Sequence, residues 1–206
     1  MNFYERYLLP PFINLACGTS VFRDKRAQLV AMAQGVVLDV GAGSGHNFPY
    51  YDAARVSNVW ALEPSEGMRK LAEKRQQQAA FAIEWLNLPC EAIPLPDASV
   101  DTVVLTFTLC TIPDWKAALQ QMHRVLKPDG RLLFCEHGLA PDVHVQHWQR
   151  RITPYWKKCA GGCHLDRPIA DYLREGGFTL QTLQEGYLPQ TPRIAGFVSW
   201  GVATRQ

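Results

Sequence analysis

The sequence predicts an α/β fold, a three-layer, Rossmann-like domain around a seven-stranded, mostly parallel sheet. Strand-like apolar runs alternate with segments of helical periodicity along the chain, which is typical of βαβ units. The apolar run at 36–40 leads directly into three alternating glycines, Gly41, Gly43 and Gly45, which predicts a buried strand followed by a tight turn. A length of 206 residues is enough for one such domain.

The helices are expected from their caps and apolar faces. Ser65 is expected to cap a helix that carries Met68, Leu71 and Ala72 on one face. Asp114 is expected to cap another, which ends at a KPDG turn and has apolar residues on one face at positions 115, 119, 122 and 126. Shorter helices are expected over 27–33 and 168–175.

Each strand is expected from an apolar run bounded by turn residues. The strands are expected over 36–40, 59–62, 81–86, 100–110, 131–135, 179–183 and 194–204. Since the chain shows no internal repeat and no linker, a single domain over 1–206 is expected. It has an N-terminal helical cover over 1–34 and a helical lid over 138–166, ahead of the last two strands.

The composition excludes several classes of protein. With 47% hydrophobic and 19% charged residues the chain is globular, and a net charge of +2 gives no strong field for nucleic acid or an anionic membrane. No run reaches the ~20 apolar residues of a transmembrane helix. Six cysteines without a signal peptide favour reduced thiols in the cytoplasm. A small-molecule partner is therefore expected, in a monomer or a homodimer.

The glycine turn predicts a cofactor site, and nearby residues indicate which cofactor. A dinucleotide fingerprint needs a small residue where this chain has His46, which argues against a nicotinamide-dependent reductase. Asp39 suits the ammonium and sulfonium groups of S-adenosylmethionine (SAM), whereas phosphates would gain nothing from it. Glu63 ends the next apolar run about 20 residues on, where a carboxylate accepts hydrogen bonds from ribose hydroxyls. The alternative is an ordinary glycine turn with two surface acids.

Four motifs cover much of the chain: 38–45 (LDVGAGSG), 62–65 (LEPS), 92–101 (AIPLPDASVD) and 124–130 (RVLKPDG). Together they resemble the class I SAM-dependent methyltransferases, and among these the group related to quinone-pathway C-methyltransferases. The resemblance implies the fold of that class, SAM as cofactor and S-adenosylhomocysteine as product. The expected cofactor-binding residues are Asp39, Gly41, Ala42, Gly43, Ser44, Gly45, Glu63, Pro64, Met68, Cys90, Glu91 and Thr106.

A narrower set of motifs comprises 108–111 (TLCT), Glu136 with His137, the residues Trp148, Gln149, Pro154 and Trp156, and 162–167 (GCHLDR). These are similar to the methyltransferase-like thiol S-methyltransferases that mammals keep on endoplasmic reticulum membranes. Those relatives carry an N-terminal hydrophobic anchor that this sequence lacks, so a soluble, bacterial-type cousin is expected.

One position departs from the pattern of these relatives. Many have Gly-Asp-Ala-Glu where this chain has 88–91 (LPCE), so Pro89 replaces the acid that holds the adenine amino group. Adenine contacts are then expected from the backbone around Cys90 or from the side chain of Glu91.

The catalytic chemistry is expected at the carboxyl ends of the strands, where ligands bind in open α/β sheets. Methyl transfer depends mostly on positioning and desolvation, and a thiol of pKa ~8.5 is already partly ionised at neutral pH, so a small, fairly apolar thiol is the first choice of acceptor. A phenolic or quinone-type acceptor, methylated on O or C, and a SAM-binding module without turnover are the alternatives.

Candidate catalytic residues are His137 and Glu136. His137 is expected to act as a base or to stabilise the thiolate, and a backbone hydrogen bond at the strand end is its alternative role. The expected substrate pocket consists of Tyr4, Tyr7, Asn47, Cys110, Thr111, Trp156 and Cys163.

Basic and aromatic residues alternate over 147–158, which admits a nucleic-acid interpretation. Because Trp148, Ile152, Tyr155 and Trp156 recur at helical spacing, an amphipathic lid over the substrate pocket is favoured.

Several histidines and cysteines of the predicted lid admit a zinc interpretation. The histidines and cysteines at 144, 147, 159, 163 and 164 match the spacing of no common structural zinc site, so no metal is expected.

Overall fold

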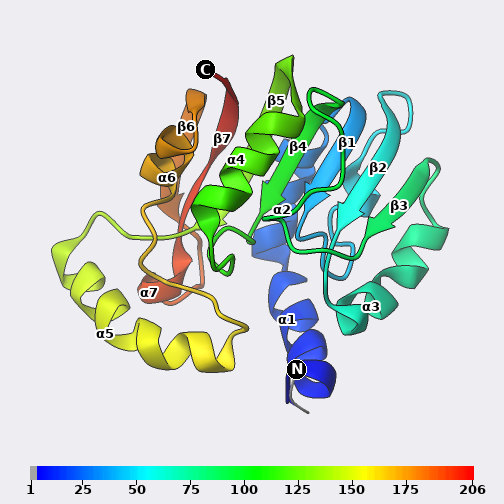
Figure 1. The fold of residues 1–206 in the computed structure, drawn as a ribbon. Helices are drawn as coiled ribbons and strands as arrows, with labels where there is room; N and C mark the ends of the chain where they lie inside the picture. The colour runs from blue at the N-terminus through cyan, green and yellow to red at the C-terminus, as the bar shows by residue number, and fades with distance from the viewer. Residues whose placement is uncertain (1–3) are drawn as a thin grey trace.

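The computed structural model describes residues 4–206 and is built on one seven-stranded sheet in the order β3-β2-β1-β4-β5-β7-β6 (Figure 1). Strands β1 to β5 run parallel, while β7 is antiparallel to both β5 and β6. The predicted mostly parallel, Rossmann-like sheet is confirmed. The strands are β1 (Gly35–Val40), β2 (Val56–Leu62), β3 (Ala82–Leu86), β4 (Val100–Thr106), β5 (Leu126–His137), β6 (Phe178–Tyr187) and β7 (Phe197–Arg205).

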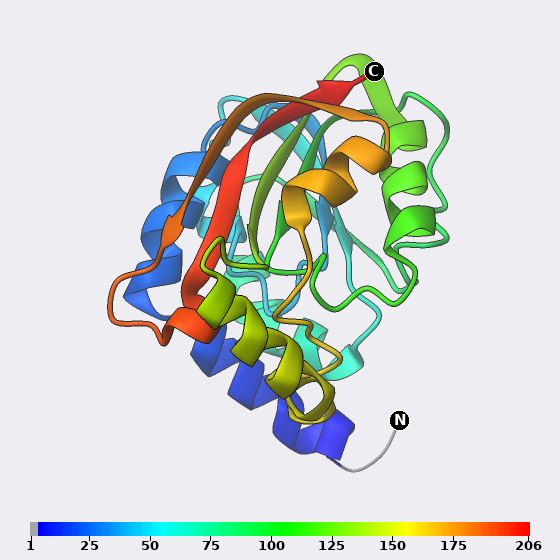
Figure 2. The same ribbon diagram turned by 90° about the vertical axis from the view of Figure 1, so that its left-hand side faces the viewer.

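Helices cover both faces of the sheet (Figure 2). On one face α2 and α3 pack through residues such as Leu29 and Ala72, and on the other α4 and α6 pack through Met122 and Leu173. The helices are η1 (Tyr4–Leu8), α1 (Leu9–Cys17), α2 (Ser20–Val30), η2 (Phe48–Tyr50), α3 (Glu66–Gln77), α4 (Trp115–Val125), α5 (Val143–Cys159), α6 (Ile169–Glu175) and α7 (Arg193–Gly196).

Local sequence explains most element boundaries. Ser65 accepts a hydrogen bond from the Met68 amide at 3.4 Å, and Asp114 accepts one from the Ala117 amide at 3.0 Å, so both predicted helix caps are confirmed. The apolar runs of β1 and β4 are buried on both faces, as strands in the middle of a parallel sheet must be.

The N-terminal segment forms a helical cover at the carboxyl ends of the parallel strands. Pro10 and Pro11 occupy the first turn of α1, where an amide N–H has no helical partner, so they start the helix. Figures 1 and 2 both place α1 and α5 at this end of the sheet, and the Tyr4 hydroxyl donates to the carbonyl of Cys159 at 2.5 Å. Within 4–206, no helix combines the length and the apolar character needed to cross a bilayer.

Several predicted boundaries were wrong. The helix expected over 27–33 is α2, which begins at Ser20 and ends at Val30. Strand β4 ends at Thr106 because Phe107 takes a left-handed φ of 54°, which turns the chain out of the sheet. Strand β5 starts at Leu126, directly after α4. The last strand starts at Phe197, since 193–196 form α7.

Helix α5 is the predicted lid helix, but it buries a different face. Its buried residues are Val145, Gln149 and Thr153, whereas Trp148 is 43% and Tyr155 is 72% exposed. Gln149 explains the difference, because its side chain accepts from the amide of residue 140 and donates to the carbonyls of residues 138 and 194. A side-chain amide whose hydrogen bonds are all made is stable in the interior. The spacing of the aromatic residues, from which the buried face was predicted, does not indicate such a residue.

Candidate active site

A cavity of about 340 Å³ lies at the carboxyl ends of β1, β2 and β4, with α1 along one side. Its walls bring together residues from the glycine turn, the end of β2, the 89–91 segment and the turn after β4. The expected site residues among them are Gly41, Ala42, Gly43, Ser44, Asn47, Glu63, Pro64, Met68, Cys90, Glu91, Thr106 and Thr111.

The glycine turn presents bare backbone to this cavity. Gly41, Gly43 and Gly45 all have positive φ, of 65°, 56° and 76°. A Cβ on Gly45 would lie 2.7 Å from the ring of Phe48, which a side chain cannot do without displacing that ring. Glycine is therefore required here both by conformation and by space.

Glu63 connects the glycine turn to the end of β2. One carboxylate oxygen accepts from the Gly43 amide at 3.1 Å and the other from the Ser65 amide at 2.8 Å. Burial raises the pKa of Glu63, and these two amides oppose the rise. Each oxygen keeps a free lone pair that can accept from a hydroxyl in the cavity.

Asp39 does not line the cavity but supports a residue that does. It is fully buried and accepts from Asn47 Nδ2 at 2.9 Å, and the same nitrogen lies 3.1 Å from Thr106 Oγ1. Burial raises the pKa of Asp39 to about 6, against the lowering effect of Asn47 and Tyr51. Asp39 thus orients the Asn47 amide, which faces the cavity.

Sequence reasoning missed Arg26, a charged side chain buried in the cavity wall. Its Nη1 donates to the carbonyl of Cys17 at 2.7 Å, while its Nε is buried without a hydrogen-bond partner among the described residues. The guanidinium is thus a positive charge in the cavity wall, where an anion can pair with it. The sequence does contain one indication of its burial. Arg26 lies at helical spacing from Leu29 and Val30, the other buried residues of α2.

His46 lines the cavity as well, although the sequence predicts no role for it beyond its departure from the dinucleotide fingerprint. Its Nε2 lies 3.0 Å from the carbonyl oxygen of Asn14. Burial first, and then Arg26 and Arg75, lower the pKa of His46 to about 4, so the ring is neutral and joins the glycine turn to α1.

The far end of the cavity is formed by Pro89, Cys90 and Glu91. Glu91 accepts from the Cys90 thiol at 3.6 Å and from the Asp114 amide at 3.3 Å. Burial and then the Glu91 charge raise the pKa of Cys90 to about 12, so this thiol stays protonated. The segment presents backbone groups and one carboxylate to the cavity.

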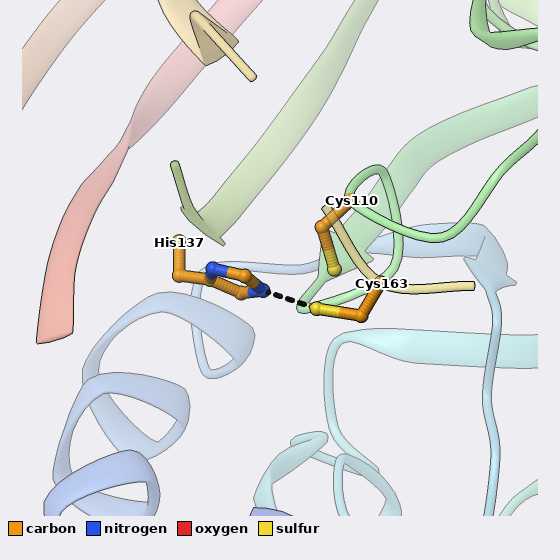
Figure 3. Close-up of side chains that lie close together, drawn as sticks. All are labelled: Cys110, His137 and Cys163. Carbon is orange, nitrogen blue, oxygen red and sulfur yellow. Dashed lines mark hydrogen bonds between the residues drawn. The ribbon is translucent and has the colours of Figure 1, made fainter. Parts of the chain in front are cut away.

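Beside the cavity lies a cluster of three soft donors, Cys110, His137 and Cys163, which we call the thiol–imidazole cluster (Figure 3). Cys110 belongs to the turn after β4, His137 ends β5, and Cys163 follows α5. His137 Nε2 lies 3.1 Å from Cys163 Sγ, and the ligand atoms of all three lie within 4.8 Å of one another. Trp156 also donates its indole N–H to Cys163 Sγ at 3.3 Å.

The cluster separates charge. The Cys110 thiol, and then His137 and Trp156, lower the pKa of Cys163 to about 4 in spite of burial. The Cys163 charge raises the pKa of His137, although burial opposes this. Hydrogen bonding to Cys163, followed by burial, raises the pKa of Cys110 well above its usual value. The three shifts together favour negative charge on Cys163 and a proton on His137, with Cys110 as a neutral thiol beside them.

Residues close to Cys110 and Cys163 in the sequence line the cavity. Thr111 and Gly161 line its wall, one and two positions away from Cys110 and Cys163. Cys17 lines the same wall, and the Cys163 charge contributes to the rise in its pKa after burial. The cluster therefore adjoins the cavity rather than forming its floor.

Comparison with known proteins agrees with this geometry. Residues 38–134 match the family described as Methyltransferase domain. The thiol S-methyltransferase TMT1B of Rattus norvegicus is 32% identical over 172 residues, which cover 78% of this chain and 68% of the relative. The chain belongs to the SAM-dependent methyltransferases.

One further relative of this methyltransferase supports the assignment, and one solved structure shows the same fold. The ubiquinone/menaquinone biosynthesis C-methyltransferase UbiE of Geotalea uraniireducens is 35% identical over 107 residues, covering 50% of this chain and 45% of the relative. A SAM-dependent methyltransferase from Thermotoga maritima has the same fold, with a TM-score of 0.67 at 20% identity, covering 98% of each chain.

The remaining expected site residues lie away from the cavity of the methyltransferase. Glu136 is fully buried under the turn after β4 and accepts from the Thr108 amide at 2.7 Å. Gly45 sits behind the glycine turn against Phe48. Tyr4 lines an adjoining surface hollow, which shares Leu9, Thr111 and Gly161 with the cavity, and Tyr7 is 55% exposed. Trp156 backs Cys163 rather than facing the cofactor.

Proposed function

We propose that this methyltransferase transfers the methyl group of SAM to the sulfur of a small, fairly apolar thiol. The observation that carries the proposal is the thiol–imidazole cluster beside the cofactor cavity, which brings an imidazole and two polarisable sulfur atoms together next to that cavity. Relatives named thiol S-methyltransferases support the same acceptor chemistry. Six free cysteines suit work in the reducing cytoplasm.

SAM fits the cavity group by group. Glu63 offers lone pairs to the ribose hydroxyls, and the bare glycine turn lets the ligand approach the backbone. The buried, unpartnered Arg26 Nε matches the methionine carboxylate. Asn47, oriented by Asp39, faces the same part of the cavity and suits the ammonium group. Cys90 and Glu91 remain for the adenine ring, whose amino group Glu91 can accept.

The reaction needs positioning more than it needs acid or base. A lone pair of the acceptor sulfur attacks the SAM methyl carbon, an S–CH₃ bond forms, and the bond from the methyl group to the sulfonium breaks. Its electron pair stays on the sulfur of S-adenosylhomocysteine. A thiol of pKa ~8.5 ionises partly before attack, and positive charge at His137 increases the ionised fraction. Alignment in a water-poor cavity supplies most of the remaining acceleration.

Titration calorimetry with SAM, followed by transfer of labelled methyl groups to a panel of thiols, phenols, quinols and amines, tests the proposal. We expect SAM binding and a thioether product whose added mass lies on sulfur. Turnover confined to phenols or quinols would replace the thiol by an O- or C-acceptor. Tight SAM binding with no turnover on any compound of the panel would favour a SAM-binding module.

A further inference from the structure

We propose that Cys110, His137 and Cys163 form a Cys₂His site for one Zn²⁺ ion, with a fourth coordination position open to the acceptor sulfur. The metal site stands on the geometry of the thiol–imidazole cluster. The role of the ion toward the acceptor rests on the proposed function. In that role the ion supplies positive charge beside the acceptor sulfur.

The three donor atoms already lie at the spacing of ligands around one ion. With Zn–S bonds of about 2.3 Å and Zn–N bonds of about 2.0 Å, tetrahedral ligands lie roughly 3.5 to 3.8 Å apart. In the cluster His137 Nε2 and Cys163 Sγ are 3.1 Å apart, and no pair of donor atoms exceeds 4.8 Å. Side-chain movements of about 1 Å or less therefore suffice to place an ion between them.

Figure 3 shows how the three side chains converge from different elements. The Cys110 and Cys163 side chains lie side by side, and the His137 ring points its Nε2 toward them. The three residues are far apart in sequence, and they meet because each lies in a loop or at a strand end on the side of the sheet where the parallel strands have their carboxyl ends. The spacing rules that weigh against zinc in the sequence describe ligands within one short loop, so they do not apply here.

The protein holds the two cysteine loops in place without help from the cluster itself. The His164 amide donates to the carbonyl of Cys110 at 2.8 Å, which joins the loops directly. Arg167 is buried and donates to the carbonyls of Leu109 and Ile112, at 2.5 and 2.7 Å. Its charge thereby satisfies the backbone on both sides of Cys110. Such rigid support is what a preorganised metal site requires.

The surroundings also resemble the outer shell of a metal thiolate. Trp156 donates its indole N–H to Cys163 Sγ, and bonds of this kind orient a ligand and tune its charge. The donor set of two thiolates and one imidazole is one that proteins use for Zn²⁺. Within residues 4–206 the group contains three such donors and no fourth. Three protein ligands with one free position are the pattern of a catalytic zinc site.

The open position gives the ion a part in methyl transfer. An acceptor thiol that binds there loses its proton to solvent and stays on the ion as a thiolate. Its lone pair then attacks the SAM methyl carbon, the sulfonium keeps the electron pair of the broken bond, and the neutral thioether leaves the ion. Thr111 and Gly161, which line the cavity wall, are close in sequence to Cys110 and Cys163, so an acceptor sulfur held by the cluster lies beside the cavity proposed for SAM.

The test begins with the metal content of the full chain. The protein is produced in zinc-supplemented medium, purified without a metal-affinity tag or chelator, and analysed by plasma mass spectrometry and zinc X-ray absorption. We expect close to one zinc per chain, with a scattering shell from two sulfur atoms at about 2.3 Å. Replacement of the zinc by Co²⁺ should give a thiolate-to-cobalt charge-transfer band.

The variants Cys163→Ser and His137→Gln should each lower zinc content at least tenfold. Cys159→Ser is the matched control, because Cys159 is an exposed cysteine just ahead of Cys163 and outside the cluster, so this variant should keep its zinc. Thermal unfolding of each variant shows whether it is folded. Because the two variants change different ligands, the test still stands if one of them fails to fold.

Each result decides between the proposals. Zinc-free protein that also takes up no Co²⁺, or zinc retained fully in both ligand variants, overturns the metal site. Thiol methylation at full rate by protein stripped of zinc overturns the role of the ion toward the acceptor and leaves the proposed function standing. Stoichiometric zinc without methylation of any thiol confirms the metal site and removes the proposed function.

Discussion

The amide of Gly43 donates to the Glu63 carboxylate at 3.1 Å, so the acid that follows β2 holds the glycine turn that follows β1. The second oxygen of Glu63 takes the Ser65 amide, which begins α3. One carboxylate thus fixes two backbone segments of the cofactor site and still faces the cavity. Cofactor binding and the shape of the turn are coupled through this side chain.

Replacement of Glu63 by Ala should weaken SAM binding at least about 100-fold. Hydrogen bonds to a charged group contribute about 1.5 to 3 kcal/mol each, and two ribose contacts are lost together with support of the turn. Titration calorimetry measures the change. Glu84→Ala, an exposed acid on the neighbouring β3, is the control and should bind SAM normally. Unchanged affinity in Glu63→Ala would remove Glu63 from the cofactor site.

Arg26→Met should abolish discrimination between SAM and decarboxylated SAM. The wild-type protein should bind SAM at least about 10-fold more tightly, because the carboxylate pairs with the buried guanidinium. In the variant the two ligands should bind alike. Arg23→Met, on the exposed face of the same helix, should keep the wild-type preference. Equal binding of both ligands by the wild type would place the carboxylate elsewhere.

The sequence predicts those parts of the site that depend on local patterns. The glycine turn is visible because a buried strand and positive-φ glycines lie together in one short run, and Glu63 because its distance from that turn is set by one helix and one strand. Asp39 is visible for the same reason, although the structure makes it the support of Asn47 instead of a wall residue.

Other parts depend on packing between distant segments. Arg26 enters the cavity because α2 begins seven residues earlier than the periodicity of 27–33 predicts. The thiol–imidazole cluster forms only when the turn after β4, the end of β5 and the loop after α5 meet at one edge of the sheet. The rule that ligands bind at the carboxyl ends of the strands predicts that Cys110 and His137 converge, but no spacing in the sequence places Cys163 between them.

His137→Ala should lower turnover at least about 100-fold while leaving SAM affinity unchanged, because the ring contacts the cluster and not the cofactor. The expected loss is the same whether the positive charge resides on the ring or on an ion that it holds. Single-turnover kinetics and calorimetry measure the two quantities separately. His147→Ala, at an exposed position of α5, is the control. Normal turnover of His137→Ala would leave this histidine a structural role only.

Glu136→Gln should weaken the fall in stability with rising pH, although Asp39 and Glu63, whose pKa values burial also raises, keep their share of it. Burial raises the pKa of Glu136 to about 7 from 4.5, so the folded protein keeps a proton that the unfolded chain has lost. Its stabilisation is complete below the unfolded pKa and is lost as the pH rises through about 7, a change of about 3 kcal/mol. Urea unfolding at about pH 5 and about pH 8 measures it.

A neutral Gln at position 136 can still accept from the Thr108 amide, so the variant should be more stable than the wild type at the higher pH. Glu175→Gln, an exposed acid of α6, should show the wild-type dependence. Identical pH profiles for Glu136→Gln and the wild type would mean that Glu136 titrates normally in the folded protein.

Gln149→Leu should cost about 3 kcal/mol or more of stability, although it places an apolar residue at a buried position. The amide side chain pairs with three backbone groups, at residues 138, 140 and 194, and each left unpaired costs about 1 to 3 kcal/mol. Urea unfolding gives the free energy of unfolding. Arg150→Leu, exposed on the same helix, should change it by no more than about 0.5 kcal/mol. Because Gln149 ties α5 to the loop before it and to α7, a stable Gln149→Leu variant would show that the helix is held by its apolar contacts instead.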